Sequence, residues 1–156
     1  MTHASITMRS AVAADLESMI AMLAEDTLGS QREDTRTPLD QAYIDAFDAI
    51  AHDPNQLLAV AARGDHVMGM MQLTFIPGLS RRGAWRGQIE SVRVSDAERG
   101  AGIGKQMFEW AISECRTRGC GLVQLTTDAS RTSAHAFYER LGFRASHLGY
   151  KLAIGD

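Results

Sequence analysis

The spacing of apolar residues predicts both helices and strands in the first half of the chain. Apolar residues three or four positions apart predict amphipathic helices over residues 15–24 and 38–52, the second capped by Thr37-Pro38. Short, mainly apolar runs predict strands over residues 6–9, 57–62 and 67–76. Gly69 interrupts the longest run and predicts a bulge or a close backbone approach there.

The second half continues with alternating strands and helices. The pattern predicts strands over residues 88–94 and 122–127, helices over residues 102–118 and 134–141, and a final β segment through the apolar positions of 148–154. A helix joins the first two of these strands, so we expect them to lie parallel, whereas the earlier strands form hairpins. The predicted fold is therefore one α/β domain over residues 1–156, with a mixed central sheet flanked by helices.

Composition narrows the function classes. Of the 156 residues 45% are hydrophobic and 22% charged, which is ordinary for a globular domain, and the net charge is −3. Mild acidity argues against nucleic acid as a partner. The N-terminus lacks the apolar run of a signal peptide, and no segment reaches the length of a membrane span, so we expect a cytoplasmic protein without a membrane partner. The 2 cysteines and 5 histidines lack metal-ligand spacing, and we expect no metal.

A glycine-rich turn connects the strand at residues 88–94 to the helix that follows. Its sequence is Arg99-Gly100-Ala101-Gly102-Ile103-Gly104-Lys105. The first amides of a helix have no intrahelical partner, and the helix dipole adds positive charge there, so this turn can bind a phosphate. A Walker loop would need glycine where Arg99 stands and Ser or Thr where Gln106 stands, and the three glycines do not have the spacing of a dinucleotide fingerprint. A tight connection that binds nothing remains the structural alternative.

Two motifs together resemble the GCN5-related N-acetyltransferases. The first is Arg99-x-x-Gly-x-Gly, which follows a strand carrying Ile89-Glu90. The second, roughly forty residues later, is an alanine followed by tyrosine and then by x-x-x-Gly-Phe, matched by Ala134, Tyr138, Gly142 and Phe143. The resemblance spans residues 57–143. It implies a sheet whose parallel strands splay apart, acetyl-CoA as co-substrate without a metal, and transfer of the acetyl group to a primary amine.

The resemblance also implies which residues bind the cofactor. The strand backbone at Val92, Arg93 and Val94 would pair with the pantetheine arm, and the turn would bind the pyrophosphate through Arg99, Gly100, Ala101, Gly102, Ile103, Gly104 and Lys105. Arg131 stands where the family often has asparagine. Because arginine donates but cannot accept, it is a candidate for a different contact, such as a salt link to a CoA phosphate.

Direct transfer from a thioester needs a base for the amine and an acid for the departing thiolate. Glu90 is the candidate base, directly or through a water. Strand alternation places it on one face with Val92 and Val94, partly buried in the cleft; the alternative is a structural pair with an arginine. Tyr138 is the candidate acid, and the alternative is a core tyrosine on an apolar helix face. Trp85 belongs either to a solvated loop or to a wall of the acceptor site.

The functional prediction is a direct-transfer N-acetyltransferase, and a non-catalytic acyl-CoA-binding sensor or partner subunit is the alternative. The presence of both Glu90 and Tyr138 favours the enzyme. The partners are then an amine of a small molecule or peptide and, in a homodimer, a second copy. No substrate signature identifies the acceptor or the length of the acyl group.

Overall fold

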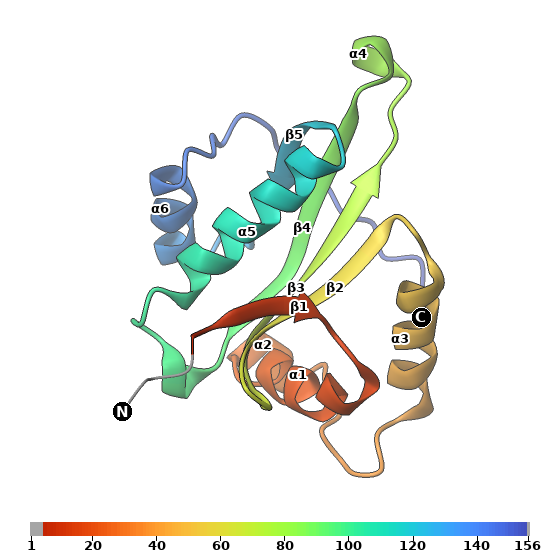
Figure 1. Ribbon diagram of the computed structural model, residues 1–156, viewed down its shortest axis with the longest axis vertical. Coiled ribbons are helices and arrows are strands. Elements are labelled where there is room, and N and C mark those ends of the chain that lie inside the picture. Colours follow the sequence, from red (N-terminus) through yellow and green to blue (C-terminus); the bar gives the residue numbers. More distant parts are fainter. Residues whose placement is uncertain (1–4, 156) are drawn as a thin grey trace.

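The computed structural model describes residues 5–155. Five strands form one sheet in the order β1-β2-β3-β4-β5 (Figure 1). Their bounds are β1 Thr7–Ser10, β2 Gln56–Arg63, β3 His66–Ile76, β4 Trp85–Val94 and β5 Cys120–Leu125. The longer helices are α1 Leu16–Leu23, α3 Gln41–His52, α5 Ile103–Thr117 and α6 Thr132–Arg140, and single turns form α2 Thr27–Ser30, α4 Ser80–Gly83, η1 Ala13–Asp15 and η2 Asp96–Glu98.

The mixed sheet predicted from the sequence is confirmed. β1 to β4 pair antiparallel with their neighbours, and β5 lies parallel to β4 after the α5 crossover. α5 and α6 cover one face of the sheet, and α1 covers part of the other (Figure 1). No helix in residues 5–155 is long and apolar enough to cross a membrane.

The core lies between α5 and the middle of the sheet. Alternate residues of β3 from Met71 to Phe75 belong to this core, as does Met68 before them, and Met68, Met71, Leu73 and Phe75 are each at most 1% exposed. Gly69 interrupts this strand where an extra β3 residue faces β2, so the predicted bulge is confirmed. A Cβ built on Gly69 would lie 2.7 Å from Met107 Sδ, which shows that α5 approaches the backbone closely there.

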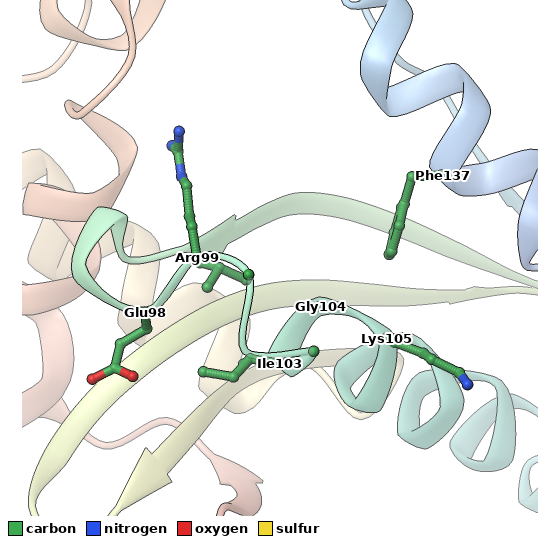
Figure 2. Close-up of a pocket in the computed structure, with 9 residues that line it drawn as sticks. Glu98, Arg99, Ile103, Gly104, Lys105 and Phe137 are labelled. Carbon is green, nitrogen blue, oxygen red and sulfur yellow. The ribbon is translucent and has the colours of Figure 1, made fainter.

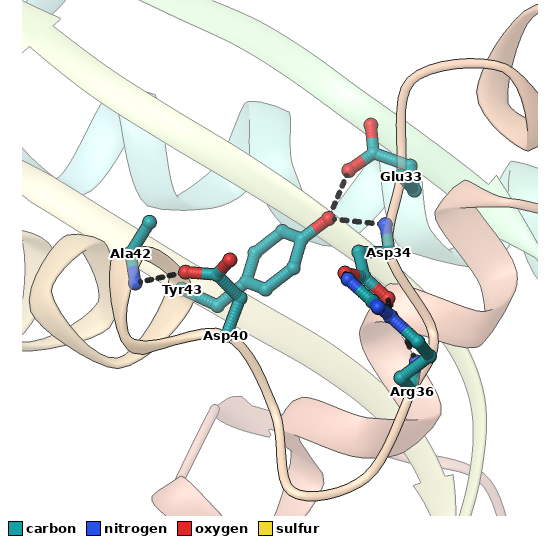
Figure 3. Close-up of polar contacts among 6 residues, drawn as sticks. All are labelled: Glu33, Asp34, Arg36, Asp40, Ala42 and Tyr43. Atoms are coloured by element: carbon teal, nitrogen blue, oxygen red, sulfur yellow. Dashed lines mark hydrogen bonds and ion pairs between the residues drawn. The ribbon is translucent and has the colours of Figure 1, made fainter.

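The connection before α3 differs from the prediction. Residues 27–30 form the short helix α2, and Asp40, not Thr37-Pro38, caps α3 by accepting a hydrogen bond from the Ala42 amide at 2.9 Å. Tyr43 ties the connection down, because its hydroxyl donates to Glu33 Oε2 at 2.8 Å and accepts from the Asp34 amide at 2.9 Å (Figure 3). Asp40 is the cap because α3 begins at Gln41, which places the Asp40 carboxylate beside the first-turn amides.

The predicted final strand is absent from the described chain. Phe143 is half-buried against Phe108, but residues 144–155 carry no strand and are all exposed. The apolar positions of that segment therefore contribute nothing to the core of this chain.

Candidate active site

The two parallel strands separate halfway along β4. β5 pairs with β4 from Trp85 to Ile89, whereas β4 continues to Val94 with β3 as its ladder partner. A gap therefore opens beside the second half of β4, at the end where the chain enters the glycine turn. This is the splay that the sequence led us to expect.

A bulge turns the side chains of β4 at this point. Ser91 has φ 53, and the register with β3 shifts between Met70 and Gln72, so β4 carries one extra residue. As a result Val92 and Val94 pack with Ile89 toward α5. Glu90 lies on the other face, where it meets Thr74, so the predicted shared face of Glu90, Val92 and Val94 is wrong.

The glycine turn leads directly into α5. Gly100 and Gly102 have φ of 83 and 75, and Gly102 is the N-cap of the helix. This left-handed conformation is strained for residues with a side chain. A Cβ built on either glycine meets no other described atom within 4 Å, so the space in front of the turn is open.

A cavity of about 410 Å³ adjoins this turn (Figure 2). Val94 and Phe137 supply its apolar walls, and the remaining lining comes from residues 98–105. Arg99 is paired with Asp96 at 2.7 Å and Lys105 with Glu109 at 3.7 Å; all four side chains are more than half exposed. Because exposed ion pairs are weak, both cations can turn to a more highly charged anion.

Tyr138 lies behind the gap in an aromatic cluster. Its ring centroid is 5.5 Å from that of Phe108 and 6.2 Å from that of Phe143. Burial raises the pKa of Tyr138, and the positive charges of Arg131 and Arg93 partly offset this rise. The phenol is therefore protonated at neutral pH, as a proton donor must be. The packing also fits the core-tyrosine alternative, and the role of Tyr138 as the acid stays a prediction.

Three arginines gather around one carboxylate near Tyr138. Asp26, the N-cap of α2, lies 3.6 Å from Arg93 Nη2 and 3.8 Å from Arg131 Nη2, and Arg32 adds to the field. The Gly29 amide and these arginines hold the pKa of Asp26 below its usual value. Burial and the neighbouring like charges lower the pKa of Arg93. Arg131 thus faces Asp26 instead of lining the cavity at the glycine turn.

Glu90 is exposed, not partly buried as predicted. Thr74 Oγ1 lies 3.4 Å from Glu90 Oε1, and the same hydroxyl donates to Gln56 Oε1 at 2.9 Å. The neighbours of Glu90 in this hydrogen-bonded row, Thr74 and Gln56, are therefore polar and uncharged. The arginine pair considered from the sequence is not among the ion pairs of the described chain.

Trp85 lies at the opposite end of β4 from the glycine turn. Nine residue steps of extended strand separate Trp85 from Val94, which is about 30 Å. Trp85 instead lines a separate hollow of about 360 Å³ with Asn55, Phe75 and Arg118. Trp85 is thus far from the glycine turn, and its place in a wall of the acceptor site stays a prediction.

Asp26 and Thr74 were missed by the sequence analysis. Asp26 carried a local signal, since an aspartate three residues before Gly29 is typical of a helix cap. Thr74 carried no local signal, because its contact with Glu90 arises only when β3 pairs with β4 across the bulge.

The comparisons with known proteins agree with this geometry. Residues 19–143 match the Acetyltransferase (GNAT) family. Aminoalkylphosphonate N-acetyltransferase of Salmonella typhimurium is 34% identical over 148 residues, which are 94% of this chain and 90% of that protein. The crystal structure of a transcriptional regulator from Bacillus halodurans C-125 superposes with a TM-score of 0.93 at 49% identity, covering 96% of this chain and 100% of that one. A Trypanosoma brucei acetyltransferase structure has a TM-score of 0.78 at 26% identity and covers 96% of this chain and 100% of its own.

The chain belongs to the GNAT family, and its parallel strands splay apart beside a glycine turn. Within that family it is an acetyl-CoA-dependent N-acetyltransferase. The enzyme assignment made from the two sequence motifs is confirmed.

Proposed function

We propose that the protein transfers the acetyl group directly from acetyl-CoA to a primary amine of a small molecule or peptide while both substrates are bound. The gap beside the second half of β4 carries this proposal. The backbone of Val92, Arg93 and Val94 can pair there with the pantetheine amides. The first amides of α5 and the open space at Gly100 and Gly102 fit the pyrophosphate.

The remaining proposed cofactor contacts lie around the same turn. Arg99 and Lys105 add ionic attraction, and Ala101, Ile103 and Gly104 contribute backbone. Arg131 is the proposed contact to a CoA phosphate, for which its guanidinium has to turn away from Asp26, 3.8 Å distant.

Glu90 is the proposed base. A lysine-like amine has a pKa of about 10.4, so near neutral pH only about one molecule in a thousand is unprotonated without help. Glu90 lies on the face of β4 opposite the core, next to the bulge, where an acceptor can approach it directly or through a water. Its exposure leaves it accessible to an incoming ammonium group.

Tyr138 is the proposed acid. The thioester is already activated, so the chain has to align the two substrates, accept one proton from the amine and donate one to the thiolate. The raised pKa of Tyr138 keeps its proton available. The positive charges of Arg93 and Arg131 stabilise negative charge on the phenol oxygen of Tyr138 or on the departing thiolate sulfur.

The arginine cluster supports a finer proposal about the acceptor: an amine that also carries an anionic group such as a phosphonate. Arg32, Arg93 and Arg131 bring three positive charges to the single carboxylate of Asp26. Arg93 Nε is buried without a hydrogen-bond partner among the described residues, so the cluster is not satisfied internally. The Salmonella relative is an aminoalkylphosphonate N-acetyltransferase, which is consistent with such an acceptor.

Thiol release from acetyl-CoA with a matched pair of acceptors tests both proposals. We expect turnover of an aminoalkylphosphonate at a kcat/KM at least roughly tenfold above that of the alkylamine of equal length, since one charge-assisted contact contributes about 1.5–3 kcal/mol. Initial-rate plots against both substrates should intersect, as a ternary complex requires; parallel lines would contradict direct transfer.

Arg93→Gln should reduce the ratio of kcat/KM for the aminoalkylphosphonate to kcat/KM for the alkylamine. Arg63→Gln is the matched control, because Arg63 Nε is also buried without a partner within residues 5–155 but belongs to β2. An unchanged ratio in Arg93→Gln would contradict the proposal that the acceptor carries an anionic group, and the transferase proposal would stand.

The sensor alternative has one observation in its favour, the 49% identity to the transcriptional regulator from Bacillus halodurans. It predicts tight acetyl-CoA binding without thiol release for any amine. The thiol-release assay, run beside calorimetric titration of acetyl-CoA, therefore distinguishes the enzyme from the sensor.

A further inference from the structure

A row of three uncharged polar side chains crosses the sheet from β2 to Glu90. Gln72 Nε2 donates to Gln56 Oε1 at 3.0 Å, and Thr74 Oγ1 donates to the same oxygen at 2.9 Å. Thr74 Oγ1 also lies 3.4 Å from Glu90 Oε1. The three uncharged residues are half-buried, whereas Glu90 is exposed at the end of the row. The row therefore leads from the partly buried face of β2 and β3 to the carboxylate of the proposed base.

Strand pairing places these four side chains on one face of the sheet. Gln56 of β2 lies opposite Thr74 of β3, and Gln72 of β3 lies opposite Glu90 of β4. Residues that are directly opposite in an antiparallel pair project to the same side, as do residues two apart in one strand. The arrangement is thus set by the register of three neighbouring strands and not by a loop.

The hydroxyl of Thr74 has a single proton, and Gln56 receives it. The 2.9 Å distance to Gln56 Oε1 is that of an ordinary hydrogen bond, whereas a hydroxyl that donates to a carboxylate lies about 2.5–2.7 Å away. At 3.4 Å, Thr74 turns an oxygen lone pair toward Glu90 instead of its proton. Gln72 donates to the same Gln56 oxygen and so helps to hold this amide in place.

A hydroxyl in this orientation can only accept a hydrogen bond from Glu90. A carboxylate has no hydrogen to donate, so before proton transfer the two oxygens face each other with lone pairs. Once Glu90 has taken a proton from the amine, its new O–H group can donate to Thr74 Oγ1. The hydrogen bond therefore forms as the proton is transferred, and interactions that are stronger along the reaction than in the ground state accelerate it.

We propose that Thr74, oriented by Gln56, is a positioning residue that accepts a hydrogen bond from Glu90 when Glu90 takes the proton of the acceptor amine. An N–H bond of the ammonium group breaks and an O–H bond forms on Glu90, while Thr74 keeps its own proton directed at Gln56. This inference rests on the proposed function, in which Glu90 is the base.

The single-turnover rate of thiol release tests the role of Thr74, with the better of the aminoalkylphosphonate and its matched alkylamine as acceptor. Thr74→Val keeps the shape of the side chain and should lower the rate roughly three- to tenfold, the contribution of one hydrogen bond at an exposed site, with acetyl-CoA affinity unchanged. Thr74→Ser restores the hydroxyl and should return the rate to near that of the wild type. Thr7→Val makes the same change in the edge strand β1 and is the matched control.

Gln56→Leu tests the orientation of the hydroxyl. Without Gln56 the proton of Thr74 can turn to the Glu90 carboxylate and stabilise it before proton transfer, so the rate should fall at least as much as in Thr74→Val. Adding Thr74→Val to Gln56→Leu removes that proton and should cause no further loss. A wild-type rate in a folded Thr74→Val or Gln56→Leu protein would contradict the proposal.

A double-mutant cycle with Glu90→Gln separates this inference from the assignment of the base. In the Glu90→Gln protein, Thr74→Val should change the rate by less than about twofold, because glutamine takes no proton from the amine. The full loss in that background would show that Thr74 acts without Glu90 and would overturn this inference alone. A wild-type rate in Glu90→Gln, or a wild type that releases no thiol with either amine, would overturn the proposed base and this inference with it.

Discussion

The two halves of β4 have the same neighbour on one side and different surroundings on the other. From Trp85 to Ile89 the strand lies between β3 and β5, and Gly87 and Ile89 are buried. From Glu90 to Val94 β5 has diverged, a bulge rotates the side chains, and no residue of this half is fully buried. The first half is paired with both β3 and β5, whereas the second half has lost β5 as a partner, and we propose that substrates bind there. Substitutions in the two halves should therefore affect different measurements.

The largest effect is expected from Glu90→Gln in the second half. Glutamine keeps the size and the contact with Thr74 but cannot take a proton, so kcat/KM should fall roughly a hundred- to ten-thousandfold with acetyl-CoA affinity nearly unchanged. Gln88→Ala, in the first half, removes only the hydrogen bond to Gln124 and should leave the rate near that of the wild type. A Glu90→Gln enzyme with wild-type rates would transfer the role of base to a water chain or another group.

Gly102→Asp should weaken acetyl-CoA binding roughly a hundredfold or more, since a carboxylate near a phosphate at 4 Å costs about 1–4 kcal/mol and a left-handed residue with a side chain adds strain. Calorimetric titration measures this loss. Gly119→Asp is the matched control, because Gly119 has the same φ of 75 and the same open surroundings at the other end of α5. Equal affinities for both variants would place the pyrophosphate elsewhere.

Tyr138→Phe should lower kcat roughly a hundredfold and leave the melting temperature close to that of the wild type, because the ring packing is kept. Since the pKa of Tyr138 is raised above 10.0, the wild-type rate should fall on the alkaline side only above that pH, and the variant should lack this fall. Tyr43→Phe in α3 loses the hydroxyl that is bonded to Glu33 and to the Asp34 amide, so it should lower the melting temperature and leave kcat unchanged. A melting shift without a rate change would make Tyr138 a core residue.

The smallest effect on activity is expected from Gly87→Ala in the first half, where the cost appears in stability. A methyl group at Gly87 would overlap Cys115 Sγ, and overpacking of this kind lowers the free energy of unfolding by about 1–3 kcal/mol. Adding Cys115→Ala should restore part of the loss, which a double-mutant cycle in urea would show. Failure of the second substitution to compensate would mean that the strand shifts instead.

The glycine turn and the course of α5 could be predicted from the sequence because both depend on local signals, namely Gly100, Gly102 and the apolar row of the helix. The bulge at Ser91 could not, since serine has no special preference for φ 53 and the extra residue is imposed by the pairing of β3 with β4. The side chain of Glu90 was placed on the wrong face for this reason.

The C-terminal segment shows a different limit of prediction. Alternation from Leu148 to Ile154 predicts a strand that the described chain does not form, because a strand forms only beside another strand. An alternating pattern indicates that a segment favours the strand conformation. It does not indicate which sheet edge the segment will pair with. The arginine cluster is similar, because Asp26, Arg93 and Arg131 come from three distant parts of the chain.

The burial of Cys115 has a practical consequence for labelling chemistry. The side chain is 0% exposed, and burial raises the pKa of its thiol to about 11, so the reactive thiolate is scarce and inaccessible in the folded protein. Because the sequence has 2 cysteines, a maleimide or disulfide reagent should count at most one thiol per native chain and two in denaturant. The rate at which the second thiol becomes reactive then reports how often the core between α5 and β4 opens, without any added fluorophore.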